Sequence, residues 1–283
     1  MKLKQRLYKH LIEIVRDRDP YMASGGHFFV QQYIREQFQQ WGKVETHEFK
    51  IGQTTHKNII LNLPPVSETA NNKPLILIGA HYDAVPGTPG ADDNATGVAV
   101  LLELAREFVA KPLKYPVQLV AFDMEEYGMV GSGEYASFLK EKKQPIRLML
   151  SLEMLGYCDR SPNSQTYPTG LEYFYPDRGD FIALVGNLPT IPDLIRLSRN
   201  IRKQGTPCEW LTVPNRGQIS PATRLSDHSP FWDNDYRAVM VTDTAFLRNP
   251  YYHKPSDTIE TLDLDFLTGV GRGLIRGIRV LFG

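Results

Sequence analysis

Hydrophobic residues recur along the chain with two spacings, one typical of helices and the other of strands. Apolar residues three or four positions apart predict helices around residues 7–15, 24–41, 95–110, 134–142, 192–204 and 264–282. Alternating or continuous apolar runs predict strands at residues 44–51, 58–63, 75–80, 117–122, 146–152, 181–185 and 238–242. In the second helix we expect an apolar stripe of Phe28, Phe29, Tyr33, Ile34, Phe38 and Trp41.

The order of these elements in the middle of the chain predicts the fold. The runs at 75–80, 117–122 and 146–152 are apolar throughout, as in strands buried on both faces, and helices separate them. This alternation predicts parallel pairing with right-handed crossovers. We therefore expect a single α/β domain over residues 1–283, with a mostly parallel central sheet flanked by helices. Helices within residues 1–42 would pack on it, and residues 160–180, rich in Pro, Tyr and Ser, would form a long surface excursion.

The charge balance excludes several classes of partner. The chain has 32 Lys and Arg and 32 Asp and Glu, so no excess positive charge draws it to nucleic acid or to an anionic membrane. Its apolar runs are far shorter than the ~20 residues of a membrane span. Charged residues follow the basic N-terminus where a signal peptide would be apolar, so we expect a cytoplasmic protein. Cys158 and Cys208 are too few for a disulfide scaffold, and we expect two buried free thiols rather than one bridge.

The first fully buried strand runs into a candidate metal ligand. His81 and Asp83 stand at its end, where ligands of open α/β sheets gather, and residues two apart on an extended chain point to the same face. A carboxylate behind a histidine fixes its tautomer and increases its basicity, as a metal-bound histidine requires. By itself, however, this pair is better explained as a surface histidine beside an acid.

Acidic residues also gather at the start of the following helix, where Asp92, Asp93 and Asn94 occupy one turn. Asp and Asn are common helix caps, and acids are favoured at the positive end of the helix dipole. Two acids and an asparagine are more than a cap requires.

Two further buried strands end in acids. Glu125 and Glu126 follow the second, and Glu153 follows the third. Neighbouring side chains on a strand face opposite ways, so both glutamates reach one site only if the chain turns there, which Gly128 permits. Adjacent carboxylates repel and raise a pKa unless a cation lies between them. Three parallel strands that each end in His81 or an acid therefore predict a metal site.

A second histidine, His253, lies in the loop before the final helix. A lone histidine in a loop is usually only a polar loop residue. Here it supplies the second imidazole that a two-metal site of nitrogen and oxygen ligands needs.

Together these residues resemble the zinc-dependent aminopeptidases of the M28 family, relatives of secreted bacterial leucine-type aminopeptidases. The resemblance covers residues 76–262, approximately. It implies a phosphorylase/hydrolase-like zinc peptidase fold and two zinc ions per chain. It assigns His81 and Glu153 to one zinc ion and Glu126 and His253 to the other.

The resemblance also implies a bridging ligand. Asp93 would bridge the two ions, because its distance from Gly97 matches that of the family's bridging aspartate; Asp92 is the alternative. The bond from Asp93 to Asn94 would be cis, as in many relatives. Glu153 departs from the best-known members, which carry Asp at this ligand, and is similar to a bacterial subgroup with this change.

The activity implied is hydrolysis of the N-terminal peptide bond of a peptide or small aminoacyl substrate, by water activated between the zinc ions. Glu125 would be the general base. Asp83 would orient His81, and Tyr252 would stabilise the oxyanion.

Other functions are compatible with the same fold. A glutaminyl cyclase would use one zinc ion to form pyroglutamate, but such relatives typically carry Trp where this chain has Tyr252. A non-catalytic receptor-like member would have lost ligands or the base, and none is missing here. A serine hydrolase would need a Gly-x-Ser-x-Gly elbow, which the sequence lacks.

The residues that select the substrate lie in loops whose conformation the sequence does not predict. These loops comprise residues 160–179, 209–224 and 245–251. Aromatic residues in the first loop would either line the pocket or pack within the loop: Tyr167, Tyr173, Phe174 and Tyr175. Asp227 and His228 resemble a family segment near the site and would support the pocket or cap a helix.

Overall fold

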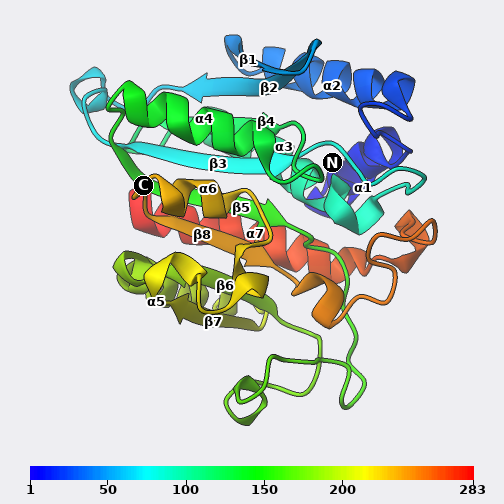
Figure 1. The fold of residues 1–283 in the computed structure, drawn as a ribbon. Helices are drawn as coiled ribbons and strands as arrows, with labels where there is room; N and C mark the ends of the chain where they lie inside the picture. Colours follow the sequence, from blue (N-terminus) through cyan, green and yellow to red (C-terminus); the bar gives the residue numbers. More distant parts are fainter.

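A computed structural model describes residues 1–283 and places eight strands in one sheet (Figure 1). The strands are β1 (Val44–Ile51), β2 (Thr54–Leu63), β3 (Leu75–His81), β4 (Val117–Phe122), β5 (Ile146–Glu153), β6 (Ile182–Asn187), β7 (Cys208–Val213) and β8 (Ala238–Thr242). Their order across the sheet is β1-β2-β4-β3-β5-β8-β6-β7. The neighbours β4, β3, β5 and β8 are parallel. β1 and β2 extend one side antiparallel, and β6 pairs antiparallel with β8 and parallel with β7.

Helices cover both faces of this sheet (Figure 1). They are α1 (Leu3–Ile14), α2 (Ser24–Gln39), α3 (Gly97–Ala110), α4 (Val130–Glu141), α5 (Ile191–Arg202), α6 (His228–Asp233) and α7 (Leu264–Phe282). α1, α2, α3, α5 and α7 contribute to a cluster of 44 buried hydrophobic residues on one face, whereas α4 and α6 contribute to a cluster of 14 on the other. The predicted α/β architecture with a mostly parallel sheet is confirmed.

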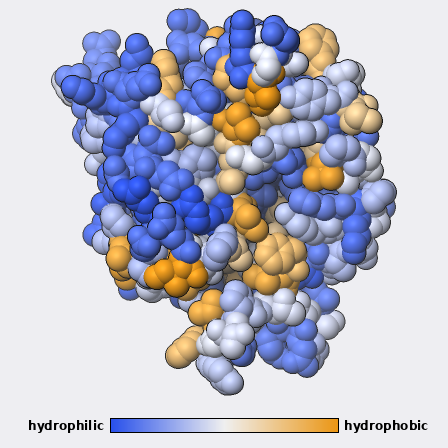
Figure 2. Space-filling view, in the orientation of Figure 1, coloured by the Kyte–Doolittle hydropathy of each residue, from blue (hydrophilic) through white to orange (hydrophobic).

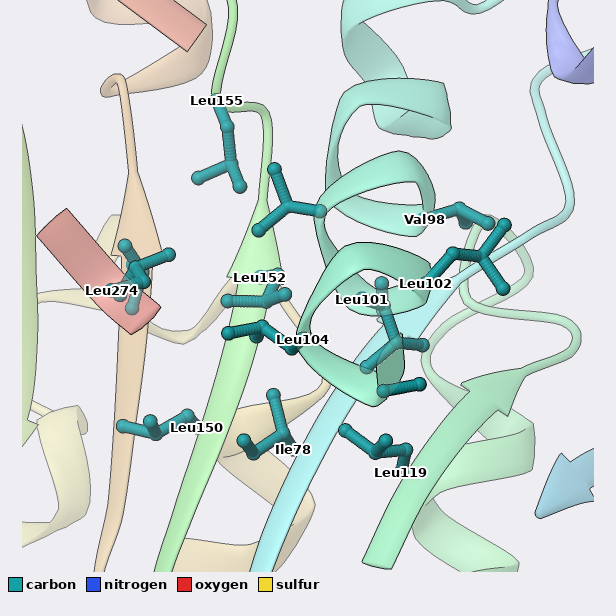
Figure 3. Packing of buried hydrophobic residues seen from close by; sticks show 14 of the residues in the cluster. Ile78, Val98, Leu101, Leu102, Leu104, Leu119, Leu150, Leu152, Leu155 and Leu274 are labelled. Atoms are coloured by element: carbon teal, nitrogen blue, oxygen red, sulfur yellow. The ribbon is translucent and has the colours of Figure 1, made fainter. Parts of the chain in front are cut away.

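The larger core is centred on α3. Figure 3 shows Leu101 and Leu104 of this helix beside Ile78 of β3 and Leu150 of β5, and all of them are fully buried. Truncating one such leucine to alanine costs about 2–5 kcal/mol of stability, because a cavity remains. The helix that starts at the acidic turn is therefore held rigidly against the two strands that carry His81 and Glu153.

Two elements were not predicted. β7 lies at the edge of the sheet, and most of its residues are only partly buried, so its sequence shows no clear apolar alternation. α6 is a helix of 6 residues, too short to show a helical repeat. All the strands and helices that the sequence predicted are present, although α4 begins at Val130 rather than at residue 134.

The predicted apolar stripe of α2 was wrong at two positions. Phe28 and Phe29 are 61% and 41% exposed, whereas Val30 is buried. The packed face of the helix instead includes two polar residues, His27 and Gln31, which hydrogen-bond to side chains beneath the helix. Hydrophobicity alone therefore misplaced the first turn of this face, whereas Ile34 and Phe38 are buried as predicted.

The excursion between β5 and β6 has no regular structure beyond the short 3₁₀ turn Leu171–Tyr173, and Figure 1 shows it extending below the sheet. Cys158 and Cys208 are both free, as predicted, although Cys158 is only partly buried. None of the helices combines the length and the apolar character required to traverse a bilayer.

Candidate metal centre

The candidate ligands meet at the carboxyl edge of the parallel strands. His81 is the last residue of β3 and Glu153 the last of β5, while Glu125 and Glu126 lie in the turn that follows β4. The carboxyl ends of neighbouring parallel strands share one edge of a sheet, which explains why these residues converge.

Asp93 lies between the two imidazoles. Its Oδ1 atom is 3.3 Å from Nε2 of His81, and its Oδ2 atom is 3.2 Å from Nε2 of His253. On the first side, Oε1 of Glu153 lies 3.5 Å from Nε2 of His81. On the second side, Oε2 of Glu126 lies 3.3 Å from Nε2 of His253. Three groups of ligand atoms result: two of them share the Asp93 carboxylate, and the third consists of His81, Glu125 and Glu126.

Glu125 borders both of the groups that share Asp93. Its Oε2 atom is 3.9 Å from Nε2 of His81. Burial raises its pKa well above the ordinary value, and the nearby carboxylates of Glu153 and Glu126 add to this effect against the opposing influence of His81. A buried carboxyl group beside two candidate ligands is placed to accept and return a proton.

These residues fit a metal ion because their polar atoms are otherwise unsatisfied. Both ring nitrogens of His81 and the Oε1 atom of Glu126 are buried without a hydrogen-bond partner. Burial and the neighbouring Asp93 carboxylate raise the pKa of Glu126 to about 7. Such crowding of carboxylates is relieved by a cation, and a set of imidazole nitrogens and carboxylate oxygens suits zinc.

Asp83 connects His81 to the turn after β4. Its Oδ1 atom is 3.5 Å from Nδ1 of His81, and its two oxygens accept hydrogen bonds of 3.1 Å from the main-chain amides of Glu125 and Glu126. One buried carboxylate therefore faces Nδ1 of the histidine and fixes the loop that presents both glutamates.

The turn after β4 is tight, as the two adjacent glutamates required. Met124 adopts φ +60° and Gly128 φ +97°. A side chain at Gly131 would collide with the carbonyl oxygen of Asp123, 2.1 Å from the position of the added carbon. This backbone turns both Glu125 and Glu126 toward the same site.

Asp92 and Asp93 have different surroundings. Asp92 points away from the imidazoles and accepts hydrogen bonds from the amide of Gly156 at 2.8 Å and from Nδ2 of Asn249 at 2.7 Å. The carboxylate of Asp257 accepts hydrogen bonds from the amides of both aspartates. The structure therefore brings Asp93, not Asp92, to the histidines. The bond from Asp93 to the next residue is cis, as expected.

Tyr252 lies against the centre. Its ring stacks on that of His253 with centroids 3.7 Å apart. Burial raises the pKa of its hydroxyl, and the carboxylates of Asp93 and Glu153 add to this rise, so the group stays protonated at neutral pH.

The three residues that begin the segment around α6 differ in their relation to the site. Ser226 donates a hydrogen bond of 2.7 Å to Oε2 of Glu153. Asp227 is fully buried, its oxygens lack hydrogen-bond partners, and burial raises its pKa to about 7. His228 does not reach the ligands: its Nε2 atom lies 2.9 Å from the carbonyl oxygen of Thr223, and burial lowers its pKa to about 4.

Arg18, which the sequence analysis did not single out, holds the loop between His81 and Asp93. Its fully buried guanidinium donates to the main-chain carbonyl oxygens of Tyr82 at 2.8 Å, Pro89 at 2.6 Å, Gly90 at 2.8 Å and Asp93 at 3.1 Å. Its neighbours in the sequence are the charged residues Arg16, Asp17 and Asp19, so no apolar pattern marks this position as buried.

An apolar pocket opens beside the centre. Glu153 and Tyr252 lie at its end near the metal-ligand candidates, and 15 of its 21 lining residues are hydrophobic. The excursion between β5 and β6 contributes Tyr167 and Tyr175, whereas Tyr173 and Phe174 are about four-fifths exposed, at 82% and 80%. Two of the four predicted aromatic residues therefore line the pocket.

The sequence is similar to those of known peptidases. Residues 58–183 match the model of peptidase family M28. The chain is 40% identical over 258 residues to the uncharacterized protein YfbL of Escherichia coli K12, a match that covers 86% of this chain and 77% of YfbL. It is 36% identical over 221 residues to aminopeptidase YwaD of Bacillus subtilis 168, a match that covers 77% of this chain but only 43% of YwaD. The chain thus spans less than half the length of that aminopeptidase.

Solved structures share the fold. LapA aminopeptidase of Legionella pneumophila matches with a TM-score of 0.74 and 20% identity over 98% of this chain and 71% of LapA. BSAP, a zinc aminopeptidase from Bacillus subtilis, matches with a TM-score of 0.60 and 22% identity, and the match covers 82% of this chain and 52% of BSAP. The glutaminyl cyclase of Tannerella forsythia matches with a TM-score of 0.68 and 19% identity, and the match covers 98% of each chain. At such identities the likeness establishes the fold alone, since one fold hosts several activities.

Proposed function

Because this chain belongs to peptidase family M28, we propose that it is a zinc-dependent aminopeptidase that releases the N-terminal residue of peptides. The observation that carries the proposal is the position of Asp93, whose two carboxylate oxygens each face a different histidine. Each histidine is accompanied by a glutamate, and Glu125 lies beside them. This arrangement supplies ligands for two ions and a separate base.

In the proposed site the side chains have distinct tasks. His81 and Glu153 would hold one zinc ion, Glu126 and His253 would hold the other, and Asp93 would supply a carboxylate oxygen to each. Bound zinc polarises the scissile carbonyl group and lowers the pKa of water from about 15.7 towards 7.

The remaining residues move protons and stabilise charge. Glu125 accepts a proton from the attacking water at Oε2 and transfers it to the nitrogen of the leaving amine. The hydroxyl of Tyr252 donates a hydrogen bond to the oxyanion that develops on the substrate. Asp83 holds His81 in one orientation through Nδ1. The excess of carboxylates favours a substrate with a free, positively charged α-amino group.

The decisive experiment combines metal analysis with a panel of aminoacyl-anilides. Two zinc equivalents per chain, together with hydrolysis that a chelator abolishes and added zinc restores, would support the proposal. Glu125→Gln should retain both ions but lose turnover. Glu141→Gln, which removes an exposed acid from α4, is the matched control and should behave as the parent protein.

The competing function is that of a glutaminyl cyclase. The structure of the Tannerella forsythia enzyme, which matches over 98% of both chains, is the reason to test it. A cyclase would bind one zinc ion and convert an N-terminal glutamine to pyroglutamate without hydrolysing any anilide. Assaying an N-terminal glutamine peptide beside the anilide panel separates the two functions.

A further inference from the structure

Four side chains form a row across the sheet that begins at the metal-ligand candidate Glu153. The register pairs Glu153 of β5 with Thr242 of β8, Thr242 with Ala183 of β6, and Ala183 with Glu209 of β7. Paired residues on neighbouring strands point to the same face of a sheet. With a spacing of ~4.8 Å between strands, Glu209 lies about 14 Å from Glu153.

This row forms part of the floor of the apolar pocket. All four residues line it, and the next row on the same face adds Met240, Val185 and Leu211. The two middle side chains, Thr242 and Ala183, are short and leave a trough between the acidic ends. Figure 2 shows hydrophobic side chains on the part of this face that lies over β6 and β7.

Glu209 is the one charged residue that lines this pocket apart from Glu153. Its only ionic partner is Nη2 of Arg202, 3.0 Å away, and the two side chains are 30% and 46% exposed. Ion pairs as exposed as this one contribute little to stability, so Arg202 can release the carboxylate.

The carboxylate also lies close to the aromatic wall of the pocket. Burial raises the pKa of Tyr175, and the charge of Glu209 adds to this rise. Tyr167 stacks on Tyr175 with ring centroids 5.9 Å apart. A cation placed beside Glu209 would therefore meet both a carboxylate and aromatic rings, which attract cations through their faces.

We propose that Glu209 lets this pocket accept peptides that begin with arginine or lysine, in addition to apolar residues. This inference rests on the proposed aminopeptidase function. A substrate whose scissile carbonyl lies at the metal centre directs its first side chain along the trough. An extended arginine side chain spans about 7 Å from Cα to its terminal nitrogens, which brings its guanidinium close to Glu209. Its methylene groups pack on Ala183 and Val185, as the apolar stems of long cationic side chains commonly do.

The test compares kcat/KM for arginyl-, lysyl- and leucyl-anilides in the parent protein and in three variants. Glu209→Gln should lower the arginine-to-leucine ratio of kcat/KM about twofold to fivefold, mainly through KM for the basic substrates. Arg202→Gln removes the competing guanidinium and should raise the same ratio. Glu172→Gln, which neutralises an exposed acid on the excursion outside the pocket, should leave the ratio unchanged.

An arginine-to-leucine ratio that is the same in Glu209→Gln and in the parent would overturn the inference while leaving the aminopeptidase function intact. An equal decrease in kcat/KM for all three anilides in both Glu209→Gln and Arg202→Gln would also overturn the inference, because the ion pair would then be merely structural. If no anilide is hydrolysed by any form, the proposed function fails, and the pocket is tested by calorimetry with butylguanidinium. Saturable binding that Glu209→Gln abolishes would then support the assignment, and absence of binding would refute it.

Discussion

Nη2 of Arg18 lies 3.1 Å from the main-chain carbonyl oxygen of Asp93, the residue whose side chain faces both histidines. The guanidinium makes no carboxylate ion pair and instead joins the loop between His81 and Asp93 through carbonyl oxygens. The segment between α1 and α2 adds a second contact, because Asp19 accepts a hydrogen bond of 2.6 Å from Tyr127 in the turn after β4. Residues before the part that matches the family model thus position the centre.

Replacing Arg18 by methionine should therefore weaken metal binding. Loss of a residue that supports metal ligands typically costs ~10–100-fold in metal affinity, and we expect a decrease in this range. Competition with a chromophoric chelator measures it without any assay of activity. The metal affinity of Arg18→Lys should lie between that of the parent protein and that of Arg18→Met, since one ammonium group cannot span the same carbonyl oxygens. Arg272→Met, at an exposed position of α7, is the control, and an equal effect of both methionine variants would contradict the assignment.

Glu125→Gln should lower kcat by about 10²–10⁴-fold, the usual contribution of a general base. Its zinc content should not change, because neither ion is assigned to this residue. Single-turnover hydrolysis of a leucyl-anilide, with metal analysis of the same sample, measures both quantities. Turnover at the parent rate would remove Glu125 from the mechanism.

Tyr252→Phe should reduce kcat by roughly 10–10³-fold with little change in KM, because a lost oxyanion donor affects the transition state most. Tyr251→Phe provides the comparison, since that ring packs edge-to-face on Tyr157, with centroids 6.0 Å apart. If both variants lose activity equally, the effect arises from the loop and not from the hydroxyl of Tyr252.

The free energy of unfolding should decrease at acid pH because Glu103 of α3 becomes protonated. This carboxylate accepts hydrogen bonds from Nε of Arg6 at 2.6 Å and faces Nε2 of His10 at 3.3 Å. Burial raises its pKa, but the contacts with His10 and Arg6 outweigh burial and lower it overall. The stabilisation is therefore present above the unfolded pKa of about 4.3 and is lost as the pH falls through the lower, folded-state pKa.

Urea unfolding of the parent protein and of Glu103→Gln tests this sign. At pH 7 the variant should be less stable by about 1.5–3 kcal/mol, the usual contribution of hydrogen bonds to a charged group. The difference should shrink below about pH 4. A difference that grows in acid would show that the carboxylate does not stabilise the fold.

Removing metal should lower the melting temperature. A ligand that binds only the folded state stabilises it in proportion to the logarithm of its concentration over Kd. Dialysis against a chelator should lower Tm, and titration with zinc should restore it in two steps or with a stoichiometry of two. Restoration complete at one equivalent would favour the single-ion alternative.

The sequence predicted three of the candidate ligands because each lies where a strand ends. His81, Glu126 and Glu153 follow or complete apolar runs, and the shared edge of parallel strands makes their convergence predictable. His253 and Asp93 needed the family resemblance, since a histidine in a loop and an acid at a helix start have common alternative explanations. The structure places all five together.

Other parts of the site have no such signal. Arg18 contacts only main-chain carbonyl oxygens, and nothing in a sequence marks which carbonyl oxygens lack partners. β7 and the position of Glu209 depend on tertiary packing, because an edge strand with mixed polarity resembles a loop. The first turn of α2 was misjudged for a related reason: His27 faces inward and lies within hydrogen-bonding distance, 2.7 Å, of Asp123, whereas Phe28 and Phe29 are exposed.

The row from Glu153 to Glu209 crosses from one stretch of chain to another. Four of the five metal-ligand candidates and the candidate base lie from β3 to the end of β5, whereas β6, β7 and the excursion, which surround the far end of the pocket, come from the following segment. His253 and Tyr252 come later still, after β8. In the proposed enzyme, most of the catalytic groups and most of the far wall of the pocket are therefore encoded by different stretches of the gene. Substitutions in β6, β7 or the excursion would change which N-terminal residue is removed and leave the four earlier ligands in place.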